Sequence, residues 1–202
     1  KQTYHIRSKL FEDSYMPTVI IDPGHGGMDP GAVYKGRQEK DDNLRLALAV
    51  GELLSQNGVD VLYTRTDDVY DSPYRKAMIA NESGAEIFVR IHANSSNDPS
   101  VNGAMFYAPS SANSYLSADV ISASNTLAST MLSFYCSTTG LANKGVLQDD
   151  NMTGINWCTI PVTIVEMGFM SNPEEDQKMA NPEFQAVIAQ GLANGIDAYF
   201  GR

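Results

Sequence analysis

The sequence predicts a single α/β domain in three layers, with helices on both faces of a central, mostly parallel (mixed) sheet. Short apolar, β-branched runs alternate with amphipathic stretches of helical period, in the order strand, helix, strand, helix, strand over residues 18–93. The 202 residues, 43% of them hydrophobic, are enough for one sizeable core and few for two. We therefore assign residues 18–202 to one catalytic domain. Residues 1–17 are polar and aperiodic, which indicates an N-terminal linker or extension.

The first half of the chain supplies three of the predicted strands and two of the helices. They are strands over 18–22, 59–64 and 86–93, and helices over 41–56 and 72–83. The run TVIID at 18–22 is continuous and β-branched, as in a strand buried on both faces. Acidic residues begin the first helix and Asn57-Gly58 follow its end, whereas Ser72 and Pro73 are typical of the start of the second.

The second half continues the alternation after a polar loop. The predicted elements are strands over 103–108 and 159–170, and helices over 118–136, 172–180 and 181–200. Leu127, Met131 and Leu132 lie on one face of the long helix, which indicates the side that packs on the core. Both terminal helices begin with an Asn-Pro pair, a common combination of N-cap and first helical residue.

Charge and hydropathy exclude some classes of partner. The chain has 14 basic and 24 acidic side chains, a net charge of −10, which disfavours binding to nucleic acid or to an anionic membrane surface. No apolar run approaches the roughly 20 residues of a membrane span. Because the chain begins at Lys1 with a polar stretch, we expect a signal, anchor or linker upstream of it.

The two cysteines, Cys136 and Cys158, have no zinc-binding spacing. We expect two separate, small buried side chains rather than a disulfide. Neither is predicted to be a catalytic nucleophile, because the chain has only three histidines and none is near either cysteine in sequence.

Polar residues follow or end several of the predicted strands. His25 lies in a glycine-rich turn after the first strand, His92 near the end of the third, and Glu166 within the last apolar run. Glu39 precedes the first helix and is expected near the same edge. Because open α/β sheets place their sites at the carboxyl ends of the strands, these four residues form one candidate site.

This set of residue types suits metal-dependent hydrolysis. Hydrolytic zinc is often held by two histidines and one glutamate, which leaves a position for water. A further, unligated carboxylate then serves as the general base. His25, Glu39 and His92 are the candidate ligands and Glu166 the candidate base. The glycines beside His25 allow a tight turn and an open approach.

Each residue also has an ordinary structural role open to it. A histidine among glycines can be a turn residue, a glutamate at a helix start complements the helix dipole, and a strand histidine can be a satisfied core group. Glu166 is harder to explain this way, because a carboxylate buried in an apolar strand needs a cation or strong hydrogen bonds. A phosphate-binding turn is disfavoured, because the nucleotide-binding glycine motifs are absent. From the residues alone, the metal site and the structural roles both remain open.

Five blocks of sequence provide further information. They are IIDPGHGGMDPGA at 20–32, EKDDNLRLALAVGELL at 39–54, VLYTRTDD at 61–68, RKAMIANESGAEIFVRIHAN at 75–94 and PVTIVEMGFMSNPEED at 161–176. In these blocks and their order the chain resembles the zinc-dependent N-acetylmuramoyl-L-alanine amidases of the amidase 3 family, which are bacterial cell-wall hydrolases. The blocks span nearly all of the chain from residue 18 onward.

The resemblance implies one zinc ion per chain, with His25, Glu39 and His92 as ligands and Glu166 as the catalytic glutamate. It implies hydrolysis of the amide between the lactyl group of N-acetylmuramic acid and the L-alanine of the peptidoglycan stem peptide. We accordingly expect a secreted or wall-associated monomer that acts on peptidoglycan. The alternatives are a zinc peptidase that cuts within the stem peptide and a non-catalytic wall-binding domain.

The chain departs from the family pattern at positions that bear on substrate binding. Many relatives have a small residue at the position of Arg90. Many also have an arginine several residues before the last strand, where this chain has Asn156 and Trp157 instead. Arg90, Asn94 and Asn156 are our candidates for substrate contacts, although for Arg90 we favour a structural ion pair. Some relatives have a long inserted helix that plugs the site, for which residues 109–120 leave no room, so we expect an open site that needs no activator.

Overall fold

The computed structural model describes residues 15–202. Most of the predicted extension over residues 1–17 therefore lies outside the described residues, and the boundary at residue 18 stays a prediction. The first strand, β1, begins at Thr18. No helix among residues 15–202 is both long and apolar enough to cross a membrane.

A mixed sheet of six strands forms the middle layer, as predicted. Its strands are β1 (Thr18–Pro23), β4 (Asp60–Tyr63), β5 (Ile87–Asn94), β6 (Ala104–Ala108), β7 (Asn143–Gln148) and β8 (Val162–Phe169), in the spatial order β4-β1-β5-β8-β6-β7. The first four of this order are mutually parallel, β6 runs antiparallel to β8, and β7 is parallel to β6. The carboxyl ends of β1, β5 and β8 consequently meet at one edge.

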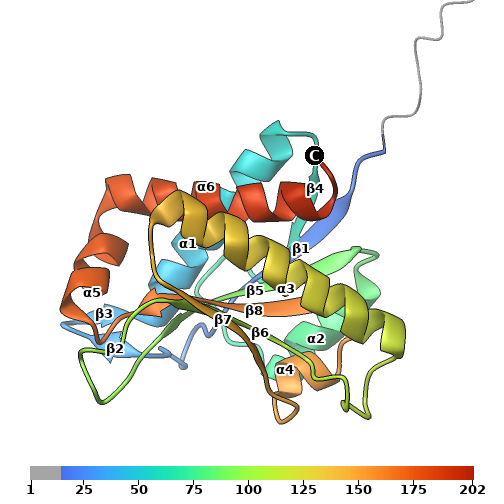
Figure 1. The fold of residues 1–202 in the computed structure, drawn as a ribbon, viewed down its shortest axis with the longest axis horizontal. Helices are drawn as coiled ribbons and strands as arrows, with labels where there is room; N and C mark the ends of the chain where they lie inside the picture. Colours follow the sequence, from blue (N-terminus) through green and yellow to red (C-terminus); the bar gives the residue numbers. More distant parts are fainter. Residues whose placement is uncertain (1–14) are drawn as a thin grey trace, which may run out of the picture.

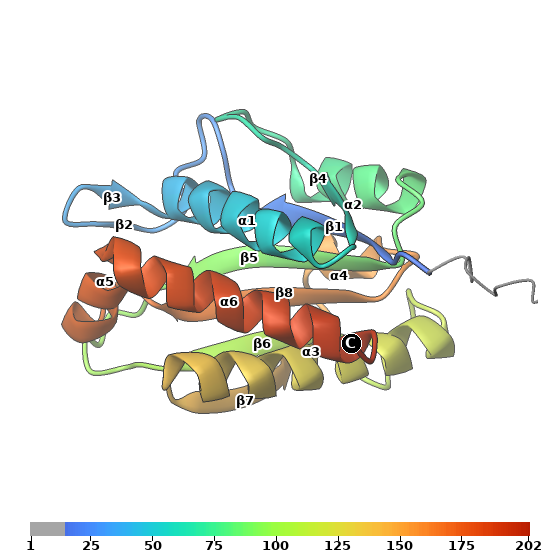
Figure 2. The same cartoon turned by 90° about the horizontal axis from the view of Figure 1, so that it is seen from above.

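Helices cover both faces of this sheet (Figures 1 and 2). They are α1 (Glu39–Gln56), α2 (Pro73–Glu82), α3 (Ala118–Thr139), α4 (Thr153–Asn156), α5 (Pro173–Ala180) and α6 (Pro182–Tyr199). Helices α1, α3 and α6 lie on one face, and α2 and α4 lie on the other (Figure 1). The prediction of a single three-layer α/β domain is confirmed.

Each face of the sheet has its own apolar core. The larger core lies under α1, α3 and α6 and includes Val50, Leu127 and Leu192. The smaller one lies under α2 and α4 and includes Ala77 and Ile155. Residues such as Val89 and Phe88, adjacent in β5, point to opposite cores, which explains why the central strands are apolar throughout.

Several short elements were not predicted. They are the two-residue strands β2 (Val33–Tyr34) and β3 (Arg37–Gln38), the edge strand β7 and the single turn α4. Helix α1 also begins at Glu39, two residues before the predicted start, so the candidate ligand is its first residue. The strand β8 begins at Val162, because Pro161 precedes it and cannot donate to the ladder.

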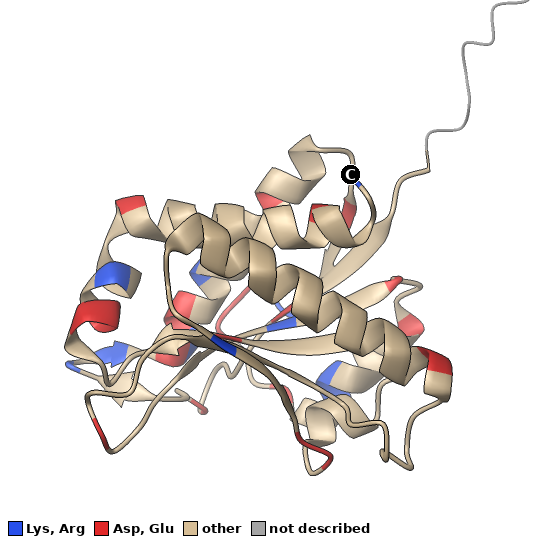
Figure 3. Cartoon of the chain, viewed as in Figure 1, with Lys and Arg blue, Asp and Glu red and all other residues tan. Residues whose placement is uncertain are grey.

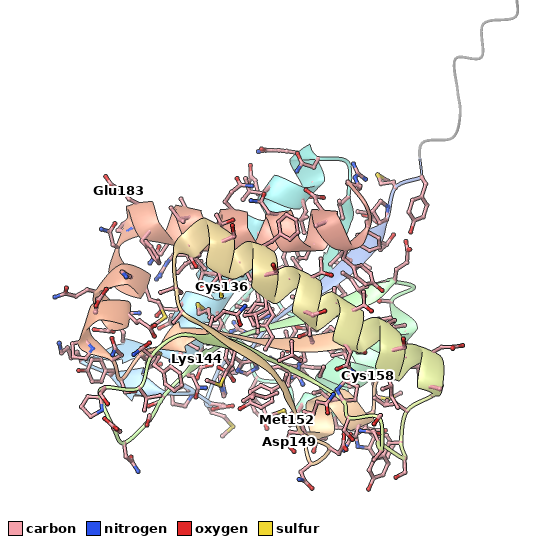
Figure 4. All side chains as sticks on the ribbon, viewed as in Figure 1. Cys136, Lys144, Asp149, Met152, Cys158 and Glu183 are labelled. Carbon is pink, nitrogen blue, oxygen red and sulfur yellow. The ribbon has the colours of Figure 1, made fainter. Side chains whose placement is uncertain are left out.

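The cysteines are separate, as expected. Cys136 is partly buried in α3 and packs against the larger core, whereas Cys158 is buried in the smaller core, and both are free thiols (Figure 4). Burial raises the pKa of Cys136 to about 11 and that of Cys158 to about 12, so neither is an activated nucleophile. The charged residues are spread over different elements rather than gathered in a basic stripe (Figure 3).

Candidate metal centre

The turn after β1 presents His25 at the open edge of the sheet. His25 has a left-handed backbone conformation, with φ of 61°, which is strained for a residue with a side chain. The preceding Gly24 donates its N–H to the carbonyl of Ile91 in β5, at 2.9 Å. A Cβ atom on Gly24 would lie 2.2 Å from the His92 ring, so only glycine lets the two histidines approach each other.

The three predicted ligands meet around one carboxylate. The Nε2 atom of His25 lies 3.1 Å from Oε2 of Glu39, and Nδ1 of His92 lies 3.0 Å from Oε1 of the same carboxylate. The two imidazole rings are 4.8 Å apart between centroids and nearly perpendicular. One ligand atom from each residue lies within 4.8 Å of the others, which is a spacing that one metal ion can bridge.

Glu39 is held in place by hydrogen bonds from three directions. The backbone N–H of Ala32 donates to Oε2 at 2.9 Å, and that of Ala93 donates to Oε1 at 3.0 Å. The amide of Asn43, one turn along α1, also donates to Oε1 at 3.1 Å. With only 3% of the residue exposed, the carboxylate is fixed before any ligand arrives.

Glu166 lies beside this cluster on β8. In the parallel pairing of β5 with β8, it is the register partner of His92, so the two side chains share a face. Its Oε2 atom is buried and has no hydrogen-bond partner among the described residues. Burial, assisted by the charge of Glu39, raises the pKa of Glu166 to about 8.

The mutual contacts also shift the pKa values of the three predicted ligands. Burial alone lowers the pKa of His25, but hydrogen bonds and charges from Glu39 and Asp29 outweigh it and raise the value to about 9. Burial prevails at His92 and lowers its pKa. The pKa of Glu39 lies well below its usual range, because the two histidines overcome the effect of burial. Such strongly perturbed groups in one place are characteristic of a functional site.

The carboxylate of Asp29 orients His25. The Oδ2 atom of Asp29 lies 2.8 Å from Nδ1 of His25, which leaves Nε2 facing Glu39. Carboxylates that orient a metal-binding histidine in this way are a frequent feature of metal sites. Asp29 was not among the predicted site residues, although its position four residues after His25 in the glycine-rich turn was a signal that could have identified it.

Two buried cations donate hydrogen bonds to backbone carbonyls of the turn that contains His25. The ammonium of Lys76, in α2, donates to the carbonyls of Pro23 at 2.8 Å and His25 at 3.0 Å. Arg65 donates to the carbonyls of Pro23 and Gly24, both at 3.1 Å. Neither cation was predicted, because both bind backbone carbonyls far away in sequence; Lys76 also lies 3.0 Å from the carboxylate of Asp22.

The three predicted substrate contacts have different surroundings. Arg90 is only 4% exposed, and its Nε lies 2.8 Å from the buried carboxylate of Asp22, which is the structural ion pair that we favoured. Asn94 is partly buried at the end of β5, close to the edge that holds His92. Asn156 donates to the carbonyl of Asp150 and accepts from Asn113, so its described contacts lie within neighbouring loops rather than with the metal cluster.

The fold and this site together define a class of protein. A His-Glu-His cluster at the carboxyl ends of parallel strands, beside a carboxylate with one buried oxygen that has no described partner, is the donor set of a metal-dependent hydrolase. The orphaned Oε2 of Glu166 fits this class, because it lacks a proton donor that a bound water or substrate would supply.

Comparison with known proteins identifies the family. The family model Amidase_3, described as N-acetylmuramoyl-L-alanine amidase, matches residues 19–198, and the chain belongs to this family. It is 34% identical to the sporulation-specific N-acetylmuramoyl-L-alanine amidase of Bacillus subtilis, over 92% of this chain and 69% of the relative. It is 30% identical to the amidase AmiA of Salmonella typhimurium, over 97% of this chain and 80% of the relative.

Solved structures agree with this assignment. The crystal structure of an N-acetylmuramoyl-L-alanine amidase from Clostridium difficile 630 matches with a TM-score of 0.84 and 33% identity, over 92% of this chain and 97% of that one. The predicted resemblance and the predicted amidase function are therefore confirmed. The family acts on peptidoglycan outside the cytoplasm, and the His25, Glu39 and His92 cluster is consistent with the metal site of such an enzyme.

Proposed function

We propose that this chain is a zinc-dependent amidase whose ligands are His25, Glu39 and His92 and whose general base is Glu166. The bond cleaved joins the lactyl carbonyl of N-acetylmuramic acid to the nitrogen of L-alanine. The observation that supports these roles is the convergence of three ligand atoms within 4.8 Å, beside a buried carboxylate oxygen without a described partner. Two nitrogens and a carboxylate favour zinc over the harder cations.

The protein contributes a preorganised donor set. The carboxylate of Glu39 is held by backbone N–H groups, and His25 is oriented by Asp29, so few groups must move when the ion binds. Zinc bound by these residues would supply a Lewis acid that polarises the lactyl carbonyl and makes water acidic enough to attack near neutral pH.

Glu166 carries the proton during the reaction. Its carboxylate accepts one proton from the attacking water as the oxygen forms a bond to the lactyl carbon. It then delivers that proton to the alanine nitrogen as the carbon–nitrogen bond breaks, so the products are a free carboxyl group and a free amine. Burial raises the pKa of Glu166 above that of an ordinary glutamate, which makes its carboxylate a stronger base toward the attacking water.

We also propose that the enzyme works as a secreted monomer without an activator. The loop at 109–117, which connects β6 to α3, contains no helix. Because β6 is antiparallel to β8, this loop leaves β6 beside the start of β8. Glu166 pairs with Met105 near the other end of β6, so this loop follows the end of β6 that is remote from the candidate site. An assay of the purified chain alone, with size-exclusion chromatography, tests both points.

Digestion of purified peptidoglycan, analysed by mass spectrometry, tests the proposed reaction. We expect stem peptides with a free L-alanine amine and glycan strands with intact muramic acid, and no such products in the presence of a chelator. A peptidase would instead release shortened peptides. If zinc-loaded enzyme produces no cleavage between lactyl group and alanine, the proposed function is wrong.

A further inference from the structure

Two exposed aromatic side chains, Tyr74 and Trp157, pack against each other on the face of the sheet that α2 and α4 cover. Their ring centroids are 5.1 Å apart and the rings are nearly perpendicular. Tyr74 is 46% exposed and Trp157 54% exposed. We call this pair the aromatic platform. Scattered in sequence, the two residues give no aromatic pattern, and only the contact of α2 with the end of α4 brings them together.

The platform is held rigidly. Tyr74 lies in the first turn of α2, which is capped by the side chain of Ser72. The side chain of Asn81, also in α2, donates to the carbonyl of Trp157 at 2.8 Å and accepts from the N–H of Thr159 at 2.8 Å. These bonds fix the segment after α4 against α2, so the two rings are placed before any ligand binds.

The platform is connected to the metal centre through α2. Lys76, two residues after Tyr74, donates to the carbonyl of His25 at 3.0 Å. The segment leading into α2 also touches the turn: a Cβ on Gly27 would lie 2.8 Å from the backbone N of Tyr70, which is itself 47% exposed. The same short helix therefore supports the ligand turn and one half of the platform.

We propose that Tyr74 and Trp157 bind a sugar ring of the glycan strand that carries the scissile amide. This inference rests on the proposed function, because the lactyl group at the site is part of a sugar within a polymer that extends beyond the metal centre. Aromatic rings present a broad apolar face to the C–H face of a sugar, while the polar tips of Tyr and Trp remain able to bind hydroxyl groups. The indole N–H of Trp157 donates to none of the described residues, which leaves it free for this purpose.

The size of the platform favours a sugar over a protein. A stable protein interface buries about 800 Å² on each partner, far more than two side chains provide. The two aromatic side chains of the platform offer an apolar area on the scale of one saccharide ring. The platform thus adds affinity for the polymer at a distance from the bond that is cut.

Fluorescence tests binding directly, because Trp157 is the one tryptophan of the chain. Glycan strands freed of stem peptides should change its emission in a saturable manner, and free stem peptide should not. In the Tyr74→Ala variant, which keeps the reporter, we expect affinity for the strands to fall by about 2- to 10-fold, the usual range for loss of one aromatic contact. Emission unaffected by the strands would overturn the inference.

Kinetics separate this inference from the proposed function. In Tyr74→Ala and Trp157→Ala, KM for polymeric peptidoglycan should rise by more than KM for a soluble muramoyl dipeptide, which lacks the neighbouring sugars of the strand. Trp157→Phe should restore part of the loss. Phe134→Ala is the matched control, because Phe134 is an exposed aromatic residue on α3, across the sheet. An active wild-type enzyme with unchanged KM for the polymer in both platform variants overturns the inference alone. A wild-type enzyme that cleaves neither substrate overturns the proposed function.

Discussion

His92 and Glu166 are direct register partners on the neighbouring parallel strands β5 and β8. Strand β5 thus places the predicted ligand His92, and β8 places the carboxylate of Glu166 beside it. One oxygen of that carboxylate has no hydrogen-bond partner among the described residues. This relationship separates two roles that glutamates play at this site: Glu39 lies between the histidines, whereas Glu166 keeps an unpartnered oxygen.

Replacing Glu166 with Gln should therefore abolish catalysis without abolishing metal binding. The amide keeps the size of the side chain but cannot accept a proton, so we expect kcat to fall by about 10²- to 10⁴-fold. Activity on peptidoglycan, together with the zinc content of the purified variant, provides the measurement. The matched control is Glu183→Gln, an exposed position at the start of α6 (Figure 4), which should retain full activity. Full activity in Glu166→Gln would contradict the assigned role.

Asp29→Asn should weaken metal binding more than it weakens the fold. The carboxylate accepts from His25 at 2.8 Å, and loss of a group that orients a metal ligand typically lowers affinity about 10- to 100-fold. Competition with a chelator measures the zinc affinity, and thermal unfolding of the metal-free protein measures the fold. Asp119→Asn, an exposed change in the first turn of α3, is the control. Equal zinc affinity in Asp29→Asn and the wild type would show that Asp29 does not orient His25.

The fold was predictable where the sequence pattern was long. Residues 41–56 and 118–136 repeat with helical period, and 18–22 and 86–93 are apolar throughout, so helix and buried strand were each distinguishable. Strand β7, in contrast, has the polar sequence NKGVLQ and Gly145 with φ of 90°, because it is an edge strand with no fully buried residue. Its pairing with β6 decides its structure, and no local pattern records that pairing.

The location of the candidate site was also predictable from the sequence. His25, His92 and Glu166 follow or lie near strand ends, which topology alone brings to one edge. Lys76 and Arg65 were not predictable, because they bind carbonyl groups 51 and 42 residues away in sequence. The ion pair of Lys76 with Asp22 is equally distant in sequence. Backbone carbonyls are present at every residue, so the sequence contains no signal of which one a buried cation will meet.

Removal of metal should lower both activity and stability. A chelator should abolish cleavage, and added zinc should restore it. An ion that binds the folded protein at 100 times its Kd stabilises it by about 2.7 kcal/mol, which corresponds to a rise in Tm of roughly 5–10 °C for a domain of this size. Scanning calorimetry with and without zinc measures the shift, and His92→Ala should show none. A zinc-dependent shift that His92→Ala retains would place the ion elsewhere.

Acid should remove the contribution of Asp22 to stability. This buried carboxylate lies 2.8 Å from Nε of Arg90 and 3.0 Å from Nζ of Lys76. It also accepts a hydrogen bond from the hydroxyl of Thr64 and interacts electrostatically with Arg65. Burial alone raises the pKa of Asp22, but the cations prevail and hold it well below its usual range. Its stabilisation is therefore complete above the unfolded-state pKa of about 3.9 and is lost as the pH falls below that value.

Asp22→Asn tests this contribution, because it leaves two buried cations without their anion. At pH 7 we expect a loss of about 3–5 kcal/mol in the free energy of unfolding, measured by urea denaturation. The difference from the wild type should shrink as the pH falls below about 4, because the unfolded chain then takes up a proton at Asp22 that the folded carboxylate, with its lowered pKa, does not. Asp119→Asn, exposed on α3, should show no such pH-dependent difference. A gap between wild type and Asp22→Asn that stays constant down to pH 2 would show that the ion pairs with Arg90 and Lys76 are not its source.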